Sequence, residues 1–355
     1  MRSRTRTRTR IRTLAVPLLL AGALLATAGL TTPAAATAPA PTHLTVAADG
    51  SAAFTGVQAA IDAVPAGNTS PVTITVQPGV YRETVVVPSN KPHIRLVGST
   101  GRAADVTIVY NNSSGTPKPD GGTYGTSGSA TFMADADDFE ARHLTFANDF
   151  DELAHADQPN HQAVALRTRG DRIVLANIAA HGDQDTLLLD SANKDRQGRV
   201  HISDSLITGN VDFIFGRATA VITDSVIEVT RRPDGTSAGY VTAPSTAAQF
   251  PGFLITDSVI TGNVGDGTYY LGRPWYAGGD ATLHPQVTIR DTHLSAAVRA
   301  TPWTDMSGFP WQGARFAEYH NTGPGSAPPT TNRPHLTDQQ AAAHTPTTWL
   351  GGWTP

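Results

Sequence analysis

The sequence predicts an all-β fold, a parallel β-helix (solenoid) with a short capping helix at its N-terminal end. Gly (33) and Pro (25) are frequent among the 355 residues, which indicates many turns and many short elements. A short strand-like unit returns through the central half of the chain, whereas helical apolar spacing near the N-terminus is convincing in only one segment. Stacked short strands explain these features better than a few long helices do.

The repeated unit reads apolar–x–polar–polar–x–apolar. Its clearest copies begin at Ile202, Ile222, Ile255 and Ile289, and looser copies begin at Phe139 and Ile173. The starts lie 20–34 residues apart, which is typical of a solenoid whose coils carry loops of different lengths. A β-sandwich is the alternative, but it favours regularly spaced hairpins, and hairpin turns between alternating strands are scarce here.

The first part of the chain supplies a helix and three strands. Apolar residues at helical spacing predict a helix over Phe54–Val64 that caps the solenoid. Alternating or β-branched runs bounded by Gly or Pro predict strands at Val72–Val76, Glu83–Val87 and His93–Val97. Residues 111–128 are expected to form a surface loop, and the irregular stretch 300–355 is a candidate for a cap at the other end.

The N-terminus predicts secretion. Six Arg alternate through residues 2–12, an apolar stretch runs from Leu14 to Leu30, and small residues lead to Ala36. This order is that of a secretory signal peptide, here residues 1–36; a membrane anchor is the alternative, but the stretch is short for a span. Residues 37–45 are expected to be a flexible lead, and residues 46–355 a single catalytic β-helix domain. The protein is expected to be extracellular.

Charge and cysteine content exclude several classes of protein. Removal of residues 1–36 leaves 20 basic and 30 acidic residues, a net charge of −10, which argues against nucleic acid or a membrane surface as a partner. The chain has no Cys, so disulfides, thiol nucleophiles and thiolate metal sites are excluded. His residues are scattered without ligand spacing, so neither a metal nor another cofactor is expected. The protein is expected to act as a monomer.

Two aspartates stand apart from the repeat. Asp204, Asp224, Asp257 and Asp291 recur within it and are interpreted as turn residues. Asp185 and Asp212 break the pattern, and Asp212 lies among bulky apolar residues, where a carboxylate must be paired or protonated. They are 27 residues apart, about one coil, so we expect them on adjacent coils of one face.

Arginine, tryptophan and glutamine residues complete the candidate site. Arg273 can hold a carboxylate ionised through a bidentate pair, and Trp275 offers a flat platform for a sugar ring, although a core Trp is an equally good interpretation. Gln162 and Gln184 carry amide N–H groups that can stabilise an oxyanion beside a carboxyl pair.

These residues fall within a series of motifs that resembles the pectin methylesterase (pectinesterase) family, of the bacterial secreted type. The motifs stand in the family's order: Gly79-Val80-Tyr81-Arg82-Glu83, Ser129-Ala130-Thr131-Phe132, Gln162-Ala163-Val164-Ala165-Leu166, Gln184-Asp185-Thr186-Leu187, Asp212-Phe213-Ile214-Phe215-Gly216, Leu271-Gly272-Arg273-Pro274-Trp275 and the C-terminal stretch from Glu318 to Ser326. The resemblance covers the chain from about Phe54 onward. It implies a right-handed parallel β-helix.

The resemblance also implies a role for each site residue. Asp212 is the implied nucleophile on the C6 methyl ester of a galacturonate unit in pectin, and Asp185 the implied general acid and then base. Gln184 and Gln162 are the implied oxyanion donors, and Arg273 orients Asp212. Thr131, Gln162, Arg273 and Trp275 match sugar-binding positions, and Phe213 is expected to line the methyl pocket. Asp183, next to Gln184, is expected to raise the pKa of Asp185.

Other functions stay open at this point. Another pectin-active β-helix enzyme, a polysaccharide lyase or a glycoside hydrolase, uses related substrates. A lyase needs a basic residue for proton abstraction, and Lys91, Lys118 and Lys194 lie in no catalytic motif. The spacing of Asp185 and Asp212 does not exclude a hydrolase. A non-catalytic β-helix adhesin is a third possibility.

Overall fold

The computed structural model describes residues 42–355, which belong to one compact unit. The expected signal peptide, residues 1–36, lies outside the described residues. Within the described part, no helix has the length and apolar character needed to cross a membrane.

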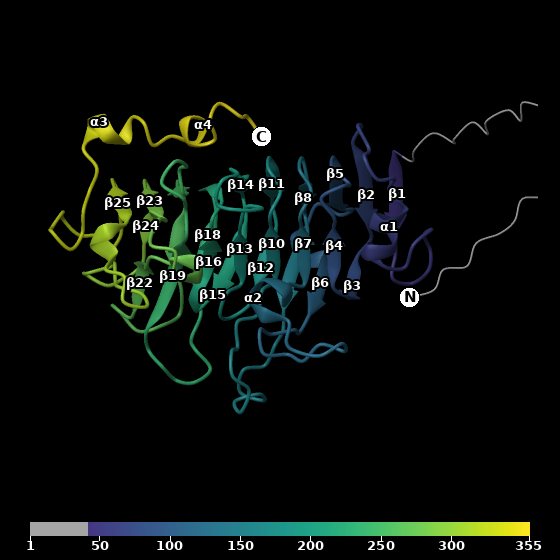
Figure 1. Ribbon diagram of the computed structural model, residues 1–355, viewed down its shortest axis with the longest axis horizontal. Coiled ribbons are helices and arrows are strands. Elements are labelled where there is room, and N and C mark those ends of the chain that lie inside the picture. Colours follow the sequence, from purple (N-terminus) through teal and green to yellow (C-terminus); the bar gives the residue numbers. More distant parts are fainter. Residues whose placement is uncertain (1–41) are drawn as a thin grey trace, which may run out of the picture. The chain divides into compact units, whose positions relative to one another are not determined.

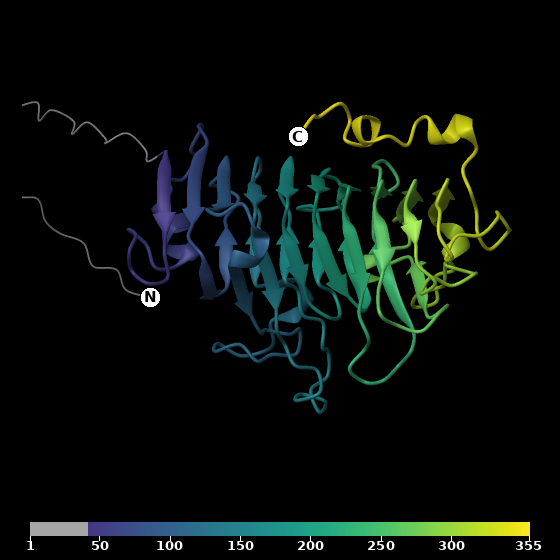
Figure 2. The same ribbon diagram turned by 180° about the vertical axis from the view of Figure 1, so that it is seen from behind.

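The unit is a parallel β-helix, as predicted from the repeat. Successive coils each add a strand to three long sheets, so that neighbours in a sheet come from different coils (Figure 1 and Figure 2). All pairings between the named strands are parallel.

The strands of the ten-stranded sheet are β1 His43–Val46, β2 Val72–Val76, β5 Ile94–Gly98, β8 Glu140–Arg142, β11 Ile173–Ala176, β14 Arg199–Ser203, β17 Thr219–Thr223, β20 Phe253–Thr256, β23 Gln286–Arg290 and β25 Arg315–Tyr319. Those of the eight-stranded sheet are β3 Gly79–Arg82, β6 Val106–Tyr110, β9 Thr145–Asn148, β12 Ala179–His181, β15 Leu206–Gly209, β18 Val226–Val229, β21 Val259–Thr261 and β24 His293–Leu294. The seven-stranded sheet contains β4 Val85–Val87, β7 Phe132–Ala134, β10 Leu166–Thr168, β13 Leu187–Leu189, β16 Val211–Gly216, β19 Gly239–Pro244 and β22 Tyr269–Gly272. Helices are short: α1 Val57–Ala63, α2 Gly125–Gly128, α3 Asp338–Ala341 and α4 Pro346–Trp349, with single 3₁₀ turns at η1 Ala103–Asp105, η2 Ala277–Gly279 and η3 Trp311–Gly313.

The repeated sequence unit forms strands of the ten-stranded sheet. Ile202, Ile222, Ile255 and Ile289 stand in register on β14, β17, β20 and β23, and none of them is exposed to solvent. Each contributes a layer of the interior, so burial of one side chain per coil builds the core along the solenoid.

The aspartates of the repeat turn the chain out of this sheet, as expected. Asp204, Asp224, Asp257 and Asp291 have φ between 47° and 52°, the left-handed conformation that Asp tolerates better than most residues. The Ser residues that follow form a ladder between coils: the Ser205 amide donates to the Ser225 hydroxyl oxygen, and the Ser225 amide to that of Ser258, both at 3.2 Å. The Asp-Ser part of the repeat therefore recurs because each coil leaves the ten-stranded sheet through the same turn.

The N-terminal end is capped by α1, which lies inside the predicted segment and is shorter. Val57, Ala60 and Ile61 are buried, and the helix packs against β1, β2 and β4. The expected flexible lead over 37–45 is wrong in its last part, because His43–Val46 pairs with Thr73–Val76 as the first strand of the ten-stranded sheet. Alternation over only four residues gave this edge strand too weak a signal.

The C-terminal stretch differs from a simple cap. Residues 315–319 form β25, where Glu318 continues the interior stack above Ile289 and is paired with the buried Arg333 at 2.9 Å. The chain then returns through α3 and α4 along the sheet (Figure 1). Trp349 and Leu350 pack on Val221 and Leu254, whose side chains are buried on the outer face of β17 and β20.

Candidate active site

The predicted catalytic residues meet in one pocket at the seven-stranded sheet. Gln162 precedes β10, Gln184 and Asp185 precede β13, and Asp212 lies in β16. Leu187 in β13 pairs with Ile214 in β16, and the Asp185 amide donates to the Val211 carbonyl at 3.0 Å. Asp185 and Asp212 therefore lie on adjacent coils, as their spacing in sequence predicts.

A β-bulge in β16 turns the Asp212 side chain toward Asp185 and away from the interior of the solenoid. Between Val211 and Ile214, β16 has one more residue than its partner β19, where Tyr240 and Thr242 are the pairing positions. Asp212 has a φ of 48°, and Asp185 has a φ of 66°, so both carboxyls are held on left-handed backbone. Bulges of this kind redirect a side chain, and here the carboxyl leaves the interior although its neighbours are core residues.

Arg273, directly after β22, pairs with Asp212 through two parallel hydrogen bonds. Its Nε–H and Nη2–H donate to the two carboxylate oxygens at 2.8 and 2.6 Å. The guanidinium lies 3.7 Å from the ring centroid of Tyr240, which stacks on Tyr270 at 5.3 Å and 10°. Arg299 covers the other end of this stack, 4.5 Å from the Tyr270 ring centroid. The stack fixes the plane of the Arg273 guanidinium and thus the bidentate geometry.

The two carboxyls differ in their affinity for a proton. Burial raises the pKa of Asp185 well above its usual range, and the nearby charge of Asp212 raises it further. Burial also raises the pKa of Asp212, but the hydrogen bonds and charge of Arg273 pull it back. Burial lowers the pKa of Arg273, yet its bonding to Asp212 outweighs this effect and leaves the pKa raised. Asp212 therefore loses its proton before Asp185 does, as in other coupled carboxyl pairs.

The pocket above these groups has one polar and one apolar side. Gln162, Gln184 and Thr126 line it with the two aspartates and Arg273, and the Oε1 atom of Gln162 has no hydrogen-bond partner in the described residues. Phe215, Ala243, Trp275 and Met306 form the apolar part, with the Phe215 and Trp275 rings 5.6 Å apart. Trp275 is thus a pocket residue and not a residue of the interior.

Two of the predicted substrate-binding residues do not reach the pocket. Phe213 is fully buried in the interior of the solenoid, because the bulge turns it inward and leaves Phe215 to face outward. Thr131 is also fully buried, and its hydroxyl donates to the Ala147 carbonyl at 2.9 Å. Phe215 and Thr126 line the pocket in their place.

Glu152 is a charged neighbour of the site that the sequence did not reveal, although it does not line the pocket. Its charge raises the pKa of Asp185, whereas Asp183, which was expected to do so, is bound to the Asn210 amide at 2.9 Å and has no such effect on Asp185. Glu152 lies in the loop between β9 and β10, where no motif or periodicity distinguishes one acid from the others. Met306 comes from a similarly irregular segment. Among residues 42–355, no group of three or more His, Cys, Asp and Glu side chains could hold a metal ion.

Comparison with known proteins decides the family. A family model described as Pectinesterase matches residues 43–352. The chain belongs to the pectinesterase family. It is an esterase, like the relatives it resembles: a pectinesterase from Ralstonia nicotianae is 41% identical over 315 residues, 79% of either chain.

Solved structures of the family have the same fold. A pectin methylesterase from Erwinia chrysanthemi superposes with a TM-score of 0.79 at 32% identity, covering 90% of this chain and 99% of its own. A pectin methylesterase solved in complex with a hexasaccharide gives the same TM-score, identity and coverage. The resemblance inferred from the motifs is confirmed.

Proposed function

We propose that this pectinesterase hydrolyses the C6 methyl esters of galacturonate units in pectin and releases methanol and pectate. The observation that carries the proposal is the asymmetry of the two buried aspartates, one bound bidentately by Arg273 and the other lacking such a partner. Ester hydrolysis through a covalent intermediate needs one carboxylate that is ionised and a neighbour that is protonated at the same pH.

Asp212 acts first in the proposed mechanism. Its carboxylate oxygen attacks the ester carbonyl carbon, and the N–H groups of the Gln184 and Gln162 amides stabilise the oxyanion that forms. Collapse of this intermediate breaks the bond to the methoxy oxygen, and Asp185 donates its proton to that oxygen. Methanol leaves, and the galacturonyl group remains bound to Asp212 as a mixed anhydride. The raised pKa of Asp185 supports its part as the acid.

Water completes the cycle. Asp185, now a carboxylate, removes a proton from a water molecule, whose oxygen attacks the galacturonyl carbon. The bond to Asp212 breaks, Asp212 regains its charge, and Asp185 is again protonated. The product acid ionises in solvent, so one ester and one water give one carboxylate, one proton and one methanol. Every proton is held by a carboxyl, so this chemistry is complete without a metal or cofactor.

The apolar side of the pocket supports the choice of substrate. Trp275 and Phe215 present ring surfaces on which the C–H face of a sugar can rest, while the polar groups stand beside them. Pectin is a polymer of the plant cell wall and reaches only a secreted enzyme. The proposed signal peptide at residues 1–36 agrees with such a location, and a monomer would suffice because all the site residues come from one chain.

The test is product analysis with highly methylated pectin. Methanol should appear without new reducing ends and without the unsaturated sugars that a lyase forms. Reducing ends in proportion to turnover would indicate a glycoside hydrolase, unsaturated product a lyase, and no change in the polymer would indicate an adhesin; each result would overturn the proposal.

A further inference from the structure

Hydrogen bonds between adjacent coils join the two turns that carry the catalytic carboxyls. The Asp185 amide donates to the Val211 carbonyl at 3.0 Å, and the Asn210 amide donates to the Asp183 carbonyl at 3.1 Å. The Asn210 side chain adds a third bond, since its Nδ2–H donates to Asp183 Oδ1 at 2.9 Å. These two partners are 27 residues apart, and each precedes one of the catalytic aspartates by two positions.

Asn210 is connected to a third coil as well. It is 1% exposed, and its carbonyl accepts a hydrogen bond of 3.0 Å from the amide of Tyr240, whose ring lies against the Arg273 guanidinium. One buried residue thus links the coil of the proposed acid, the coil of the proposed nucleophile and the coil that backs Arg273. Neither Asn210 nor Asp183 lines the catalytic pocket, so an effect of this pair on the reaction passes through its neighbours.

The backbone of the two catalytic turns needs such support. Asp185 and Asp212 have φ of 66° and 48°, a left-handed conformation that is unfavourable for a residue with a Cβ. Backbone of this kind persists where the surrounding contacts over-determine it. Gly209 allows the close approach of the two coils, because a Cβ at this position would lie 2.8 Å from the Asp183 carbonyl oxygen. The hydrogen bonds of Asn210 therefore act where the backbone is least favourable on its own.

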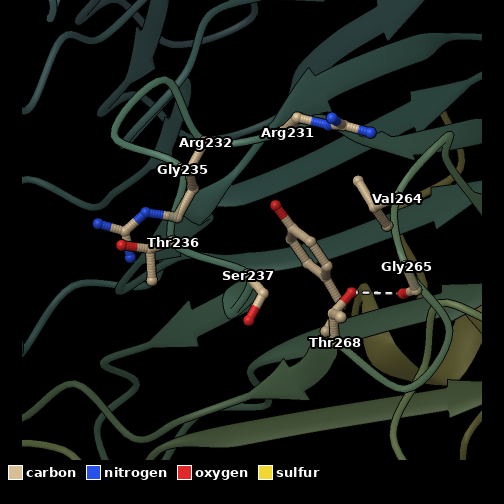
Figure 3. A pocket seen from close by; sticks show the side chains of 9 residues that line it. Arg231, Arg232, Gly235, Thr236, Ser237, Val264, Gly265 and Thr268 are labelled. Carbon is tan, nitrogen blue, oxygen red and sulfur yellow. Dashed lines mark hydrogen bonds between the residues drawn. The ribbon is translucent and has the colours of Figure 1, made fainter.

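Asp183 is held by this amide and not by a cation. Burial and the charge of Asp151 raise the pKa of Asp183, and no basic side chain within residues 42–355 forms an ion pair with it. The cation of the neighbouring loop, Arg232, lines a separate pocket (Figure 3) and is paired with Asp234 at 2.6 Å. Among the described residues, Asn210 makes the one side-chain hydrogen bond to the Asp183 carboxyl, so the place of that carboxyl depends on Asn210.

We propose that Asn210 is a positioning residue, which through Asp183 and Tyr240 holds the oxyanion donor, the acid and the nucleophile in their relative places. The inference rests on the proposed function for the roles of these groups. Loss of the Asn210 side chain leaves the Asp183 carboxyl without a donor, and the turn that carries Gln184 can then move relative to the nucleophile. A displacement of about 1 Å can lower a catalysed rate by about 100-fold. The effect should fall on kcat, because the groups that line the pocket are all still present.

The test compares Asn210→Ala with Gln286→Ala in methanol release from highly methylated pectin. Gln286 is also buried, and its Oε1 accepts a hydrogen bond of 3.1 Å from the Gly252 amide of the adjacent coil, but it lies outside the catalytic pocket. Both variants should lose stability in urea. At a temperature where both are folded, kcat should fall about 10–100-fold in Asn210→Ala with KM within about 2-fold, whereas Gln286→Ala should keep the wild-type kcat.

A further variant keeps the bond and exchanges its ends. In Asp183→Asn/Asn210→Asp, the amide at position 183 can donate to the carboxylate at position 210. At the optimal pH of this double variant, kcat should return to within about 3-fold of the wild type. Rescue of this kind would show that the hydrogen bond, and not the identity of either residue, sets the rate.

Three kinetic results would overturn the inference: a wild-type kcat in folded Asn210→Ala, an equal fall in Gln286→Ala, and an exchanged variant as slow as Asn210→Ala. A crystal structure of Asn210→Ala does not depend on turnover. It should show the turn of Gln184 displaced from its wild-type place, and an unmoved turn would also overturn the inference. A wild type that releases no methanol would refute the proposed function, while a displaced turn in the same variant would leave the positioning role standing.

Discussion

Replacing Arg273 by lysine separates the charge beside Asp212 from the geometry of its hydrogen bonds. The Arg273 guanidinium donates two hydrogen bonds, of 2.8 and 2.6 Å, to the two oxygens of the Asp212 carboxylate. The ammonium group of lysine keeps the positive charge but cannot make this bidentate pair. A hydrogen bond to a charged group contributes about 1.5–3 kcal/mol. Loss of one such bond, at about 1.4 kcal/mol for each unit of pKa, should raise the pKa of Asp212 by about 1–2 units.

The consequence is a displaced pH profile. Because the reaction needs ionised Asp212, activity falls as the pH drops through its pKa, and a higher pKa moves that acidic limb upward by about 1–2 pH units. The assay is methanol release across pH, plotted as kcat/KM because this ratio reports the free enzyme. An acidic limb that stays in place in a folded Arg273→Lys variant would refute the assignment of Asp212 as the group that Arg273 keeps ionised.

Two further predictions test the surroundings of Asp212 and Asp185, and a third tests the buried ion pair near the C-terminus. Glu152→Gln should move the alkaline limb of the kcat/KM profile to lower pH. Loss of the Glu152 charge lowers the pKa of Asp185, so that Asp185 loses its proton at a lower pH. Asp183→Asn is the control and should leave the alkaline limb in place. Tyr240→Leu should move the acidic limb upward by up to about 1 pH unit, because the cation–π contact with Arg273 that it removes contributes about 0.5–2 kcal/mol. Tyr240→Phe keeps the ring and should match the wild type. Identical profiles for the two variants would contradict the role of Tyr240 in positioning Arg273. Glu318→Gln should lower the free energy of unfolding, measured in urea, by about 3–5 kcal/mol, because Arg333 is left buried without its counter-charge. Asp149→Asn removes the exposed pair with Arg82 and should leave the unfolding transition nearly unchanged. A similar loss of stability in both variants would contradict the claim that burial makes the Glu318–Arg333 pair more important for stability.

The solenoid could be predicted because one physical requirement repeats on every coil. Each coil places an isoleucine in the interior and turns at an aspartate, and so Ile202, Ile222, Ile255 and Ile289 appear as a pattern in the sequence. The adjacency of Asp185 and Asp212 follows from the same period. The spacing thus predicts on which coil a residue of the repeat lies.

Features that depend on a single residue could not be placed in this way. The bulge in β16 adds one residue and thereby places Phe213 and Phe215 on opposite faces, and period-2 alternation gives no sign of where such an insertion falls. Met306 reaches the pocket, and the charge of Glu152 acts on Asp185, from irregular segments whose course depends on contacts with the rest of the fold.

The amino-acid sequence carries one sign that the C-terminal segment returns along the ten-stranded sheet. β17 and β20 are buried on both faces, as their continuous apolar runs around Val221 and Leu254 indicate. A strand of this kind needs a cover on its outer side. Trp349, which covers Val221 and Leu254, lies far from both of them in the sequence. No local sequence pattern therefore predicts this contact.

The most direct test of the central claim is the rate of methanol release by Asp212→Asn on highly methylated pectin, with the fold checked by far-ultraviolet circular dichroism. The amide preserves the shape of the side chain but removes the nucleophilic charge. Loss of the nucleophile in a covalent hydrolase typically costs at least about 10⁴-fold in rate, and a fall of this size in a folded variant is expected. A folded Asp212→Asn protein that releases methanol at the wild-type rate would contradict the claim.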